Sequence, residues 1–168
     1  MKRRLTMARS LINDPDLLLL DEPTTGLDPQ ARHVVWERLF QLKARGVTLV
    51  LTTHYMDEAE QLCDRLVVMD KGRIAAEGSP RELIAAHSTR EVLELRLQPG
   101  SQESVARTIA GVGKRLEVLP DRLLVYAQDG DAAMAAVHHH GVVPQSILVR
   151  RSSLEDVFLK LTGRTLVD

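Results

Sequence analysis

Thirteen residues, LLLLDEPTTGLDP at positions 17–29, constrain the fold of this chain more than any other segment. Four consecutive leucines, bounded by turn-forming residues, are too few for a helix and suit a strand covered on both faces, as in a parallel sheet. Two carboxylates, Asp21 and Glu22, follow this strand. Asp28-Pro29 favours a helix start, because aspartate caps free N–H groups and proline at the first helical position loses no hydrogen bond. The segment therefore predicts a strand, a tight turn and a helix.

Beyond this segment the hydrophobic pattern predicts alternating strands and helices up to about residue 88. The predicted elements of this first part are a helix over 1–13, a strand over 17–20, a helix over 28–45, a strand over 47–52, a helix over 55–63, strands over 65–69 and 73–77, and a helix over 80–86. The last helix begins with a capping box and a proline at its first position, Ser79-Pro80-Arg81-Glu82. An α/β domain with a parallel sheet is therefore expected over residues 1–88.

The remaining residues, 89–168, have a different order of elements. They are predicted to form strand 91–97, helix 101–110, strand 115–119, strand 122–127, helix 131–140 and strand 144–150, followed by a helix over 153–163. The order βαββαβ is that of a ferredoxin-like fold. We therefore expect a second, small α+β domain that begins at residue 89.

Composition excludes several classes of function. The net charge of −1 provides no strong field for DNA, RNA or an anionic membrane surface, and aromatic residues, at 3%, are too few for platforms that stack bases. The apolar runs are shorter than the roughly 20 residues that cross a bilayer. The single cysteine, Cys63, cannot form an internal disulfide, which fits a reducing cytosol. We therefore expect no nucleic acid partner and no direct membrane span, so any membrane role comes through a partner.

Three titratable residues are predicted to lie together at one edge of the parallel sheet. Asp21 and Glu22 end the strand over 17–20, and His54 follows the strand over 47–52. Ligands of α/β sheets bind beyond the carboxyl ends of the strands. There, one carboxylate can hold Mg²⁺, the second can accept a proton from an attacking water, and the imidazole can bond a phosphate or that water. Each residue alone would suit a solvated strand end, but their coincidence favours a nucleotide-hydrolysing site.

These residues resemble the motifs of a known family, the ATPase subunits of ABC transporters. LLLLDEP resembles the Walker B segment, TTGLDP the D-loop and TTH the switch-histidine loop, while MKRRL resembles the start of the helix that follows the LSGG signature. The segments ARHVVWERL, THYMDEAEQLCDRLVVMDKGRIAAEGSP and SLEDVFLKLTG are similar to ABC-2-type exporters of the drug-resistance and nodulation-factor kind. The resemblance covers essentially the whole chain. It implies part of the parallel sheet of a P-loop nucleoside triphosphatase (NTPase), followed by the small C-terminal domain that these subunits often carry.

The resemblance also implies a role for each candidate residue. Asp21 would hold Mg²⁺ through water, Glu22 would be the general base, and His54 would sense the γ-phosphate of ATP. Asp28 and its loop would reach across a dimer to the ATP site of a second ATPase subunit. The family further implies a membrane permease subunit of the ABC-2 type as a partner, and a cytoplasmic position, peripheral on the inner face of the cell membrane.

Several motifs of the family are missing from this sequence. The phosphate-binding pattern G-x-x-x-x-G-K-[ST], the glutamine loop and the LSGG tetrad do not occur in the 168 residues. Gly111-Val112-Gly113-Lys114 lacks the earlier glycine and the hydroxyl residue, and it precedes a predicted strand. Because that pattern normally holds the phosphates, we expect a fragment of an exporter ATPase that alone neither binds ATP tightly nor hydrolyses it. ATP and Mg²⁺ would then need the missing part or a partner subunit.

Two other functions fit parts of this pattern. A stand-alone module without enzymatic activity could pair with a complete ABC ATPase through its Asp28 loop and its C-terminal domain, and regulate it. A chromosome-maintenance or DNA-repair ATPase shares the Walker B and D-loop layout, but the near-neutral charge, the lack of coiled-coil heptads and the SLEDVF segment argue against it. We also expect residues 1–88 to leave an apolar edge and face uncovered, because part of their sheet is missing.

Overall fold

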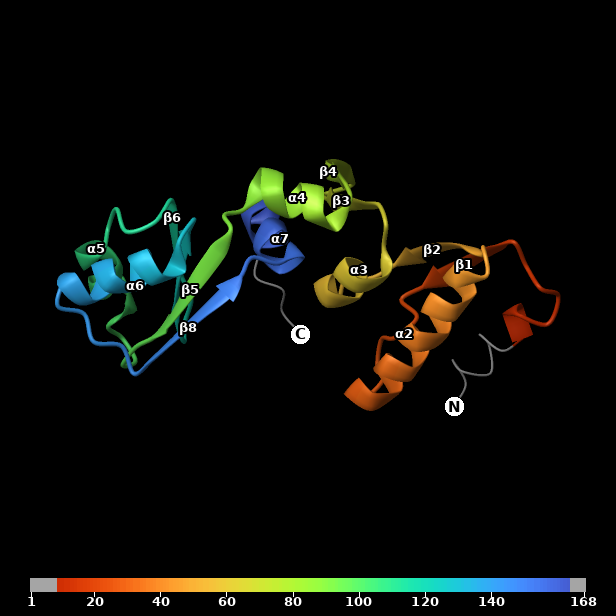
Figure 1. The fold of residues 1–168 in the computed structure, drawn as a ribbon, viewed down its shortest axis with the longest axis horizontal. Coiled ribbons are helices and arrows are strands. Elements are labelled where there is room, and N and C mark those ends of the chain that lie inside the picture. Colours follow the sequence, from red (N-terminus) through yellow and green to blue (C-terminus); the bar gives the residue numbers. More distant parts are fainter. Residues whose placement is uncertain (1–8, 164–168) are drawn as a thin grey trace. The chain divides into compact units, whose positions relative to one another are not determined.

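The computed structural model describes residues 9–163 and forms two compact units, Met1–Asp64 and Arg65–Asp168 (Figure 1). Among the described residues, the first unit has one two-stranded sheet, the second has a two-stranded and a four-stranded sheet, and each unit has its own hydrophobic core. The mixture of helices and sheets confirms the expected α/β class for the chain.

The division between the units differs from the expected boundary at residues 88–89. Helix α4 (Pro80–His87) packs on α7 (Leu154–Thr162), and the Ser88 hydroxyl donates to the Ser152 hydroxyl at 3.0 Å. These contacts join α4 to the C-terminal part of the chain within one compact unit. The predicted domain boundary between residues 88 and 89 stays a prediction.

The first unit is built on two parallel strands. Strand β1 (Leu17–Asp21) pairs with β2 (Thr48–Thr52), and α2 (Pro29–Ala44) connects them, while α3 (Met56–Leu62) follows β2. The core of this unit is aliphatic and joins alternate residues of β1 to α2 and α3: Leu18, Leu20, Val35, Leu39 and Leu62. The predicted strands and helices of this segment are therefore confirmed. Most of the helix expected over 1–13 lies outside the described residues, and positions 11–13 form a turn.

The expectation that the leucine strand is covered on both faces is wrong for the described residues. Leu17 and Leu19 are 52% and 71% exposed, and Val50 on β2 is 52% exposed. Side chains of a strand alternate between its faces, and the helical packing covers only the face that carries Leu18 and Leu20. Within residues 9–163, no element covers the other, apolar face of the two-stranded sheet, and an uncovered apolar face was expected.

The second unit begins with an antiparallel hairpin. Strands β3 (Leu66–Asp70) and β4 (Arg73–Gly78) are joined by Lys71 and Gly72, both in the left-handed conformation that a tight two-residue turn requires. Helix α4 follows with the predicted capping box, in which Ser79 and Glu82 bond each other's backbone N–H groups.

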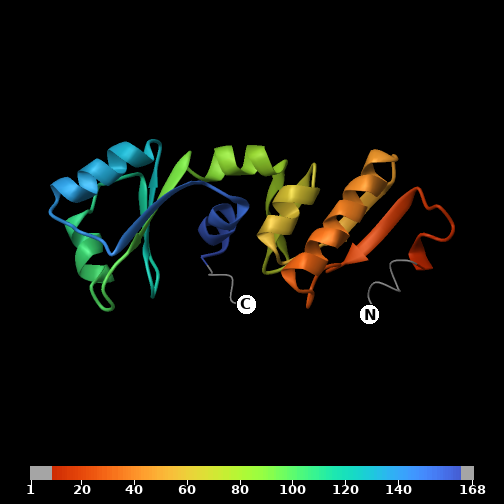
Figure 2. The same cartoon turned by 60° about the horizontal axis from the view of Figure 1, so that its bottom comes forward.

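The rest of the second unit is a four-stranded antiparallel sheet with two helices on one face. The elements are β5 (Glu91–Arg96), α5 (Gln102–Thr108), β6 (Arg115–Val118), β7 (Leu123–Ala127), α6 (Gly130–His139) and β8 (Ser146–Arg151). The strand order is β6-β7-β5-β8, so the expected βαββαβ arrangement is confirmed. Figure 2 shows α5 and α6 on one side of this sheet and α7 on the other.

A buried network of ion pairs and hydrogen bonds links α7 to the four-stranded sheet. Asp156, which is fully buried, accepts hydrogen bonds from both terminal nitrogens of Arg150 at 2.7 and 2.9 Å, from Ser153 N at 2.8 Å and from the Tyr126 hydroxyl at 3.0 Å. Burial raises the pKa of Asp156, but the hydrogen bonds and charge of Arg150 outweigh it and hold that pKa below its ordinary value of 3.8. The carboxylate is therefore ionised in the folded protein.

We expect Asp156→Asn to lower the free energy of unfolding of the second unit by about 3 kcal/mol, because it leaves a half-buried guanidinium without its main partner. The folded pKa of Asp156 is lowered, so its stabilisation is full above the unfolded pKa and is lost as pH falls through the folded pKa. A urea titration read from NMR signals of β5 and β7, at pH 7 and pH 3, measures both effects. The exposed Glu103→Gln is the control, and equal stability of Asp156→Asn and the control at pH 7 would contradict the prediction.

We also expect the chain to self-associate through the bare face of the β1–β2 sheet, because exposed contiguous apolar surface on a sheet favours association. Leu19→Lys should weaken this association by placing a charge in the middle of the face. Sedimentation velocity over a range of concentrations measures it. Val143→Lys, at an exposed valine in a loop of the other unit, is the matched control. A wild-type chain that stays monomeric at every concentration would refute the expectation.

Candidate functional site

The carboxyl ends of β1 and β2 coincide at one edge of their sheet. The strands are parallel with Asp21 opposite Thr52, so residues that follow both strands are neighbours. The Thr52 hydroxyl donates to Asp21 Oδ1 at 2.5 Å, and Glu22 N donates to Thr52 O at 3.0 Å. The strand pairing thus positions Asp21 and Glu22 where β1 ends and the predicted loop begins.

Glu22 has an unusual backbone conformation, with φ of 45°. A left-handed conformation in a residue other than glycine costs of order 1 kcal/mol and clusters at functional sites. Here the chain turns sharply after β1, and the carboxylate is directed by two neighbours. Thr25 Oγ1 donates to Glu22 Oε2 at 3.2 Å, and the Nδ1 atom of His54 lies 3.2 Å from Glu22 Oε1.

His54 comes from the loop after β2, as the sequence predicted. Its side chain is 50% exposed and that of Glu22 is 43% exposed, so both groups face solvent and can be reached by a substrate. The structure therefore brings together the acidic pair and the histidine that sequence reasoning selected. Their catalytic roles remain predictions.

Asp28 lies at the start of α2 and has a local structural task. Its Oδ1 atom accepts a hydrogen bond from Ala31 N at 2.9 Å, which caps the helix, and Pro29 occupies the first helical position. Asp28 is also exposed, and Gly26 in the preceding turn adopts φ of 74°. The predicted turn and cap are thus present, and a role of Asp28 toward a second subunit stays a prediction.

The oxygen atoms at the sheet edge fit a Mg²⁺ ion whose other ligands are waters and phosphate oxygens. Mg²⁺ prefers oxygen ligands and usually keeps several waters, with one or two carboxylates and phosphate oxygens completing its shell. Asp21 provides such a carboxylate, with the Thr52 hydroxyl beside it. Within residues 9–163, no group of three or more His, Cys, Asp or Glu side chains is placed to hold a metal ion. The site therefore fits a Mg²⁺ ion bound with a phosphate, but not a cage of protein ligands.

The glycine-rich segment Gly111–Lys114 has a packing role in the second unit. A side chain at Gly113 would lie 2.6 Å from the backbone oxygen of Tyr126, and Lys114 N donates to that oxygen at 2.7 Å. The glycine is thus explained by the close approach of the chain to β7. This agrees with the prediction that the segment is not a phosphate-binding loop.

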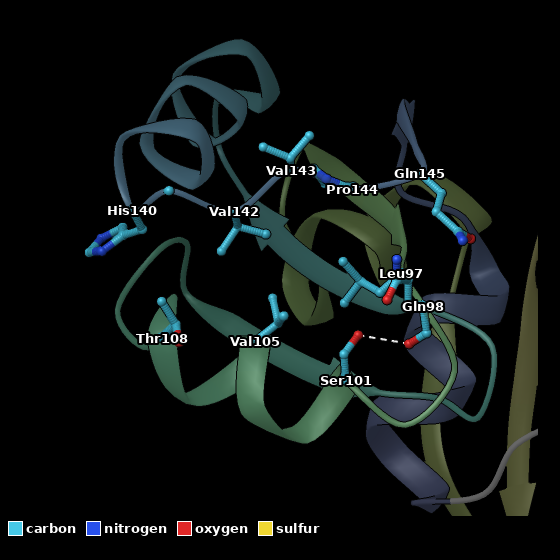
Figure 3. A pocket seen from close by; sticks show the side chains of 11 residues that line it. Leu97, Gln98, Ser101, Val105, Thr108, His140, Val142, Val143, Pro144 and Gln145 are labelled. Atoms are coloured by element: carbon cyan, nitrogen blue, oxygen red, sulfur yellow. Dashed lines mark hydrogen bonds between the residues drawn. The ribbon is translucent and has the colours of Figure 1, made fainter.

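A hollow of about 500 Å³ in the second unit lies between the start of α5 and the loop after α6 (Figure 3). Val105 and Val142 form part of its wall, and Ser101, Thr108 and His140 supply polar groups. The Ser101 hydroxyl is committed to Gln98 O at 2.7 Å, within the turn that precedes α5. The hollow belongs to a different unit from Asp21 and Glu22 and forms no part of the candidate site.

Four residues of the site were not selected from the sequence. Thr52 and Thr25 direct the two carboxylates, Tyr55 contacts the His54 ring, and Arg32 lies over the Tyr55 ring. The register of the two parallel strands would have indicated Thr52, because it places that residue opposite Asp21. The contact of Arg32 with Tyr55 joins α2 to the loop before α3, and no pattern in the sequence signals it.

Comparison with known proteins gives two family matches. Residues 102–163 match the family described as "Nodulation factor export protein NodI, C-terminal domain". Residues 2–56 match the family described as "AAA domain, putative AbiEii toxin, Type IV TA system".

Relatives named Nod factor export ATP-binding protein I match along the whole chain. The protein from Cupriavidus metallidurans is 50% identical over 168 residues, which are 100% of this chain and 54% of the relative. The protein from Mesorhizobium japonicum is 51% identical over 164 residues, 98% of this chain and 47% of the relative. The chain therefore spans about half the length of these relatives. The expected resemblance to nodulation-factor exporter ATPases is confirmed.

Among solved structures, a nucleotide-free ATP-binding cassette from an ABC transporter aligns with a TM-score of 0.46 and 31% identity, over 50% of this chain and 33% of that one. An ATP-binding subunit of an ABC transporter aligns with a TM-score of 0.39 and 39% identity, over 43% of this chain and 30% of that one.

We expect Asp28→Ala to lower the stability of the first unit by about 1 kcal/mol, because the first turn of α2 loses its cap. Asp28→Ser should restore most of the loss, since a serine hydroxyl can accept the same hydrogen bond. Urea unfolding followed by fluorescence of Trp36, the single tryptophan and part of α2, measures the change. Equal stability of all three proteins would show that the cap is unimportant.

Proposed function

We propose that this chain, a relative of the Nod factor export ATP-binding proteins along its whole length, forms part of an ATP-hydrolysing subunit of an ABC-type exporter. The observation that carries the proposal is the contact of Glu22 with His54 at the carboxyl ends of two parallel strands. A carboxylate and an imidazole at this position can orient and deprotonate a water that attacks a phosphate.

The geometry of each group supports the role that we propose for it. Glu22 is the general base, because its carboxylate is oriented by Thr25 and His54 and is accessible to solvent. Asp21 holds Mg²⁺ through water, and the ion, when bound, stabilises charge on the phosphates of ATP. His54 bonds the terminal phosphate or the attacking water.

The proposed partners are a membrane permease subunit of the ABC-2 type and a second ATPase subunit, which the Asp28 loop would contact. With these partners, the location that we propose for the chain is the cytoplasm, at the inner face of the cell membrane. In the part of the chain that the structure describes, no helix has the length and hydrophobicity to span a membrane.

The alternative, a module that regulates a complete ATPase without hydrolysing ATP, rests on one feature of the sequence. The 168 residues contain no phosphate-binding pattern. Both proposals give the isolated chain little affinity for ATP. They differ in whether the chain supports ATP hydrolysis once it is joined to a segment that carries the phosphate-binding pattern.

We expect ATP hydrolysis from a chimera in which this chain replaces the matching segment of the Cupriavidus metallidurans relative. In this chimera Glu22→Gln should lower kcat about 100-fold or more, because a positioned general base contributes roughly 10²–10⁴ in rate. Steady-state phosphate release measures the activity. The exposed Glu37→Gln on α2 is the matched control.

Two outcomes would contradict the proposal. One is a folded chimera that binds ATP but hydrolyses none while the parent relative is active, which favours the regulatory module. The other is a Glu22→Gln chimera as active as the Glu37→Gln control, which would show that Glu22 is not the general base.

A further inference from the structure

Tyr55 lies between the candidate histidine and helix α2. The ring centroids of Tyr55 and His54 are 4.2 Å apart, with an interplanar angle of 40°. The guanidinium carbon of Arg32 lies 4.2 Å from the centroid of the same Tyr55 ring. His54 in turn contacts Glu22, so an unbroken row of side chains runs from α2 to the proposed general base.

The guanidinium of Arg32 is held in place by its surroundings. Its side chain is only 21% exposed, and its Nη1 atom lies 3.4 Å from Asp57 Oδ2 at the start of α3. A cation over an aromatic ring is attracted more strongly when both are shielded from water. Arg32 is largely shielded and Tyr55 is half-buried, so this contact favours the observed position of the ring.

Tyr55 is also fixed through its backbone. Tyr55 N donates to Thr53 Oγ1 at 3.0 Å, and Tyr55 O accepts from Ala59 N at 3.1 Å as α3 begins. The ring therefore projects from a defined position between the end of β2 and α3.

Arg32 connects this row to the Asp28 turn. Arg32 N donates to Asp28 O at 2.9 Å, so the arginine stands one helical turn after the residue that caps α2. A displacement of the Asp28 turn would also move Arg32, because this backbone hydrogen bond joins the two residues in the first turn of α2. The His54 ring and the Asp28 turn are thus physically linked.

We propose that Arg32 and Tyr55 are positioning residues, which hold the His54 imidazole against Glu22 and tie its orientation to the Asp28 turn. The assignment rests on the proposed function, in which Glu22 and His54 act on ATP.

A purely structural role of Arg32 can be separated from this one. Besides the contact of Arg32 with Asp57, α2 and α3 are joined by Trp36 Nε1, which donates to the buried Glu58 at 3.1 Å. Loss of Arg32 therefore leaves α3 attached to α2. The fluorescence of Trp36 reports whether that packing survives in each variant.

The first test uses the 168-residue chain and needs no activity. NMR of histidine labelled with ¹³C and ¹⁵N should show a changed shift and faster motion of the His54 ring in Arg32→Ala and Tyr55→Leu. Tyr55→Phe, which keeps the ring, should resemble the wild type. Arg38→Ala, on an exposed part of α2 where its partner is Gln41, is the matched control. The proposal is overturned if His54 responds no more to Arg32→Ala and Tyr55→Leu than to Arg38→Ala.

The second test uses the ATPase chimera. Arg32→Ala and Tyr55→Leu should lower kcat roughly 10- to 100-fold, because small misplacement of a catalytic group has effects of that size, while KM for ATP changes less than twofold. Arg32→Lys should recover part of the loss. In a His54→Ala background, Arg32→Ala should have no further effect, since residues that act through one another are not additive.

The two tests separate the two proposals. An inactive wild-type chimera contradicts the proposed function, and the NMR result then still decides whether Arg32 and Tyr55 hold His54. An active chimera in which the effects of Arg32→Ala and His54→Ala simply add contradicts positioning through the histidine and leaves the proposed function intact.

Discussion

The parallel pairing of β1 with β2 is the constraint on which the candidate site depends. Its register sets Asp21 opposite Thr52, and the residues that follow each strand, Glu22 and His54, meet as a consequence. A slip of one residue would turn every side chain of the strand to the other face and would separate these groups. Five backbone partners along β1 and the leucine contacts with α2 hold this register against such a slip.

The sequence predicts those parts of the structure that depend on local chemistry. Asp28 and Pro29 define the start of α2, and Ser79 with Glu82 defines that of α4, because caps and proline act within one helical turn. The approach of His54 to Glu22 was also predictable, since it needs only two parallel strands that end at the same edge.

What could not be predicted depends on contacts between distant residues. A run of four leucines indicates burial on both faces, yet burial is decided by what packs there, and Leu19 is exposed in this chain. Asp156 lies within the helix predicted over 153–163 and was not singled out, whereas the structure makes it the centre of a buried ion network with Arg150 and Tyr126. The left-handed backbone of Glu22 was likewise not predicted, and its N–H group donates to Thr52, 30 residues away in sequence.

The energy of the contact between Glu22 and His54 explains why its surroundings matter. Both side chains are close to half exposed, and ion pairs at such positions contribute about 0–1 kcal/mol. This is too little to fix an imidazole that rotates about two bonds. The His54 ring lies tilted against the Tyr55 ring, and the cation–π contact of Arg32 with Tyr55 contributes about 0.5–2 kcal/mol and involves a less exposed side chain. The carboxylate contact alone is therefore weak, and in the proposed arrangement the Tyr55 ring, itself held by Arg32, adds to it in orienting the histidine.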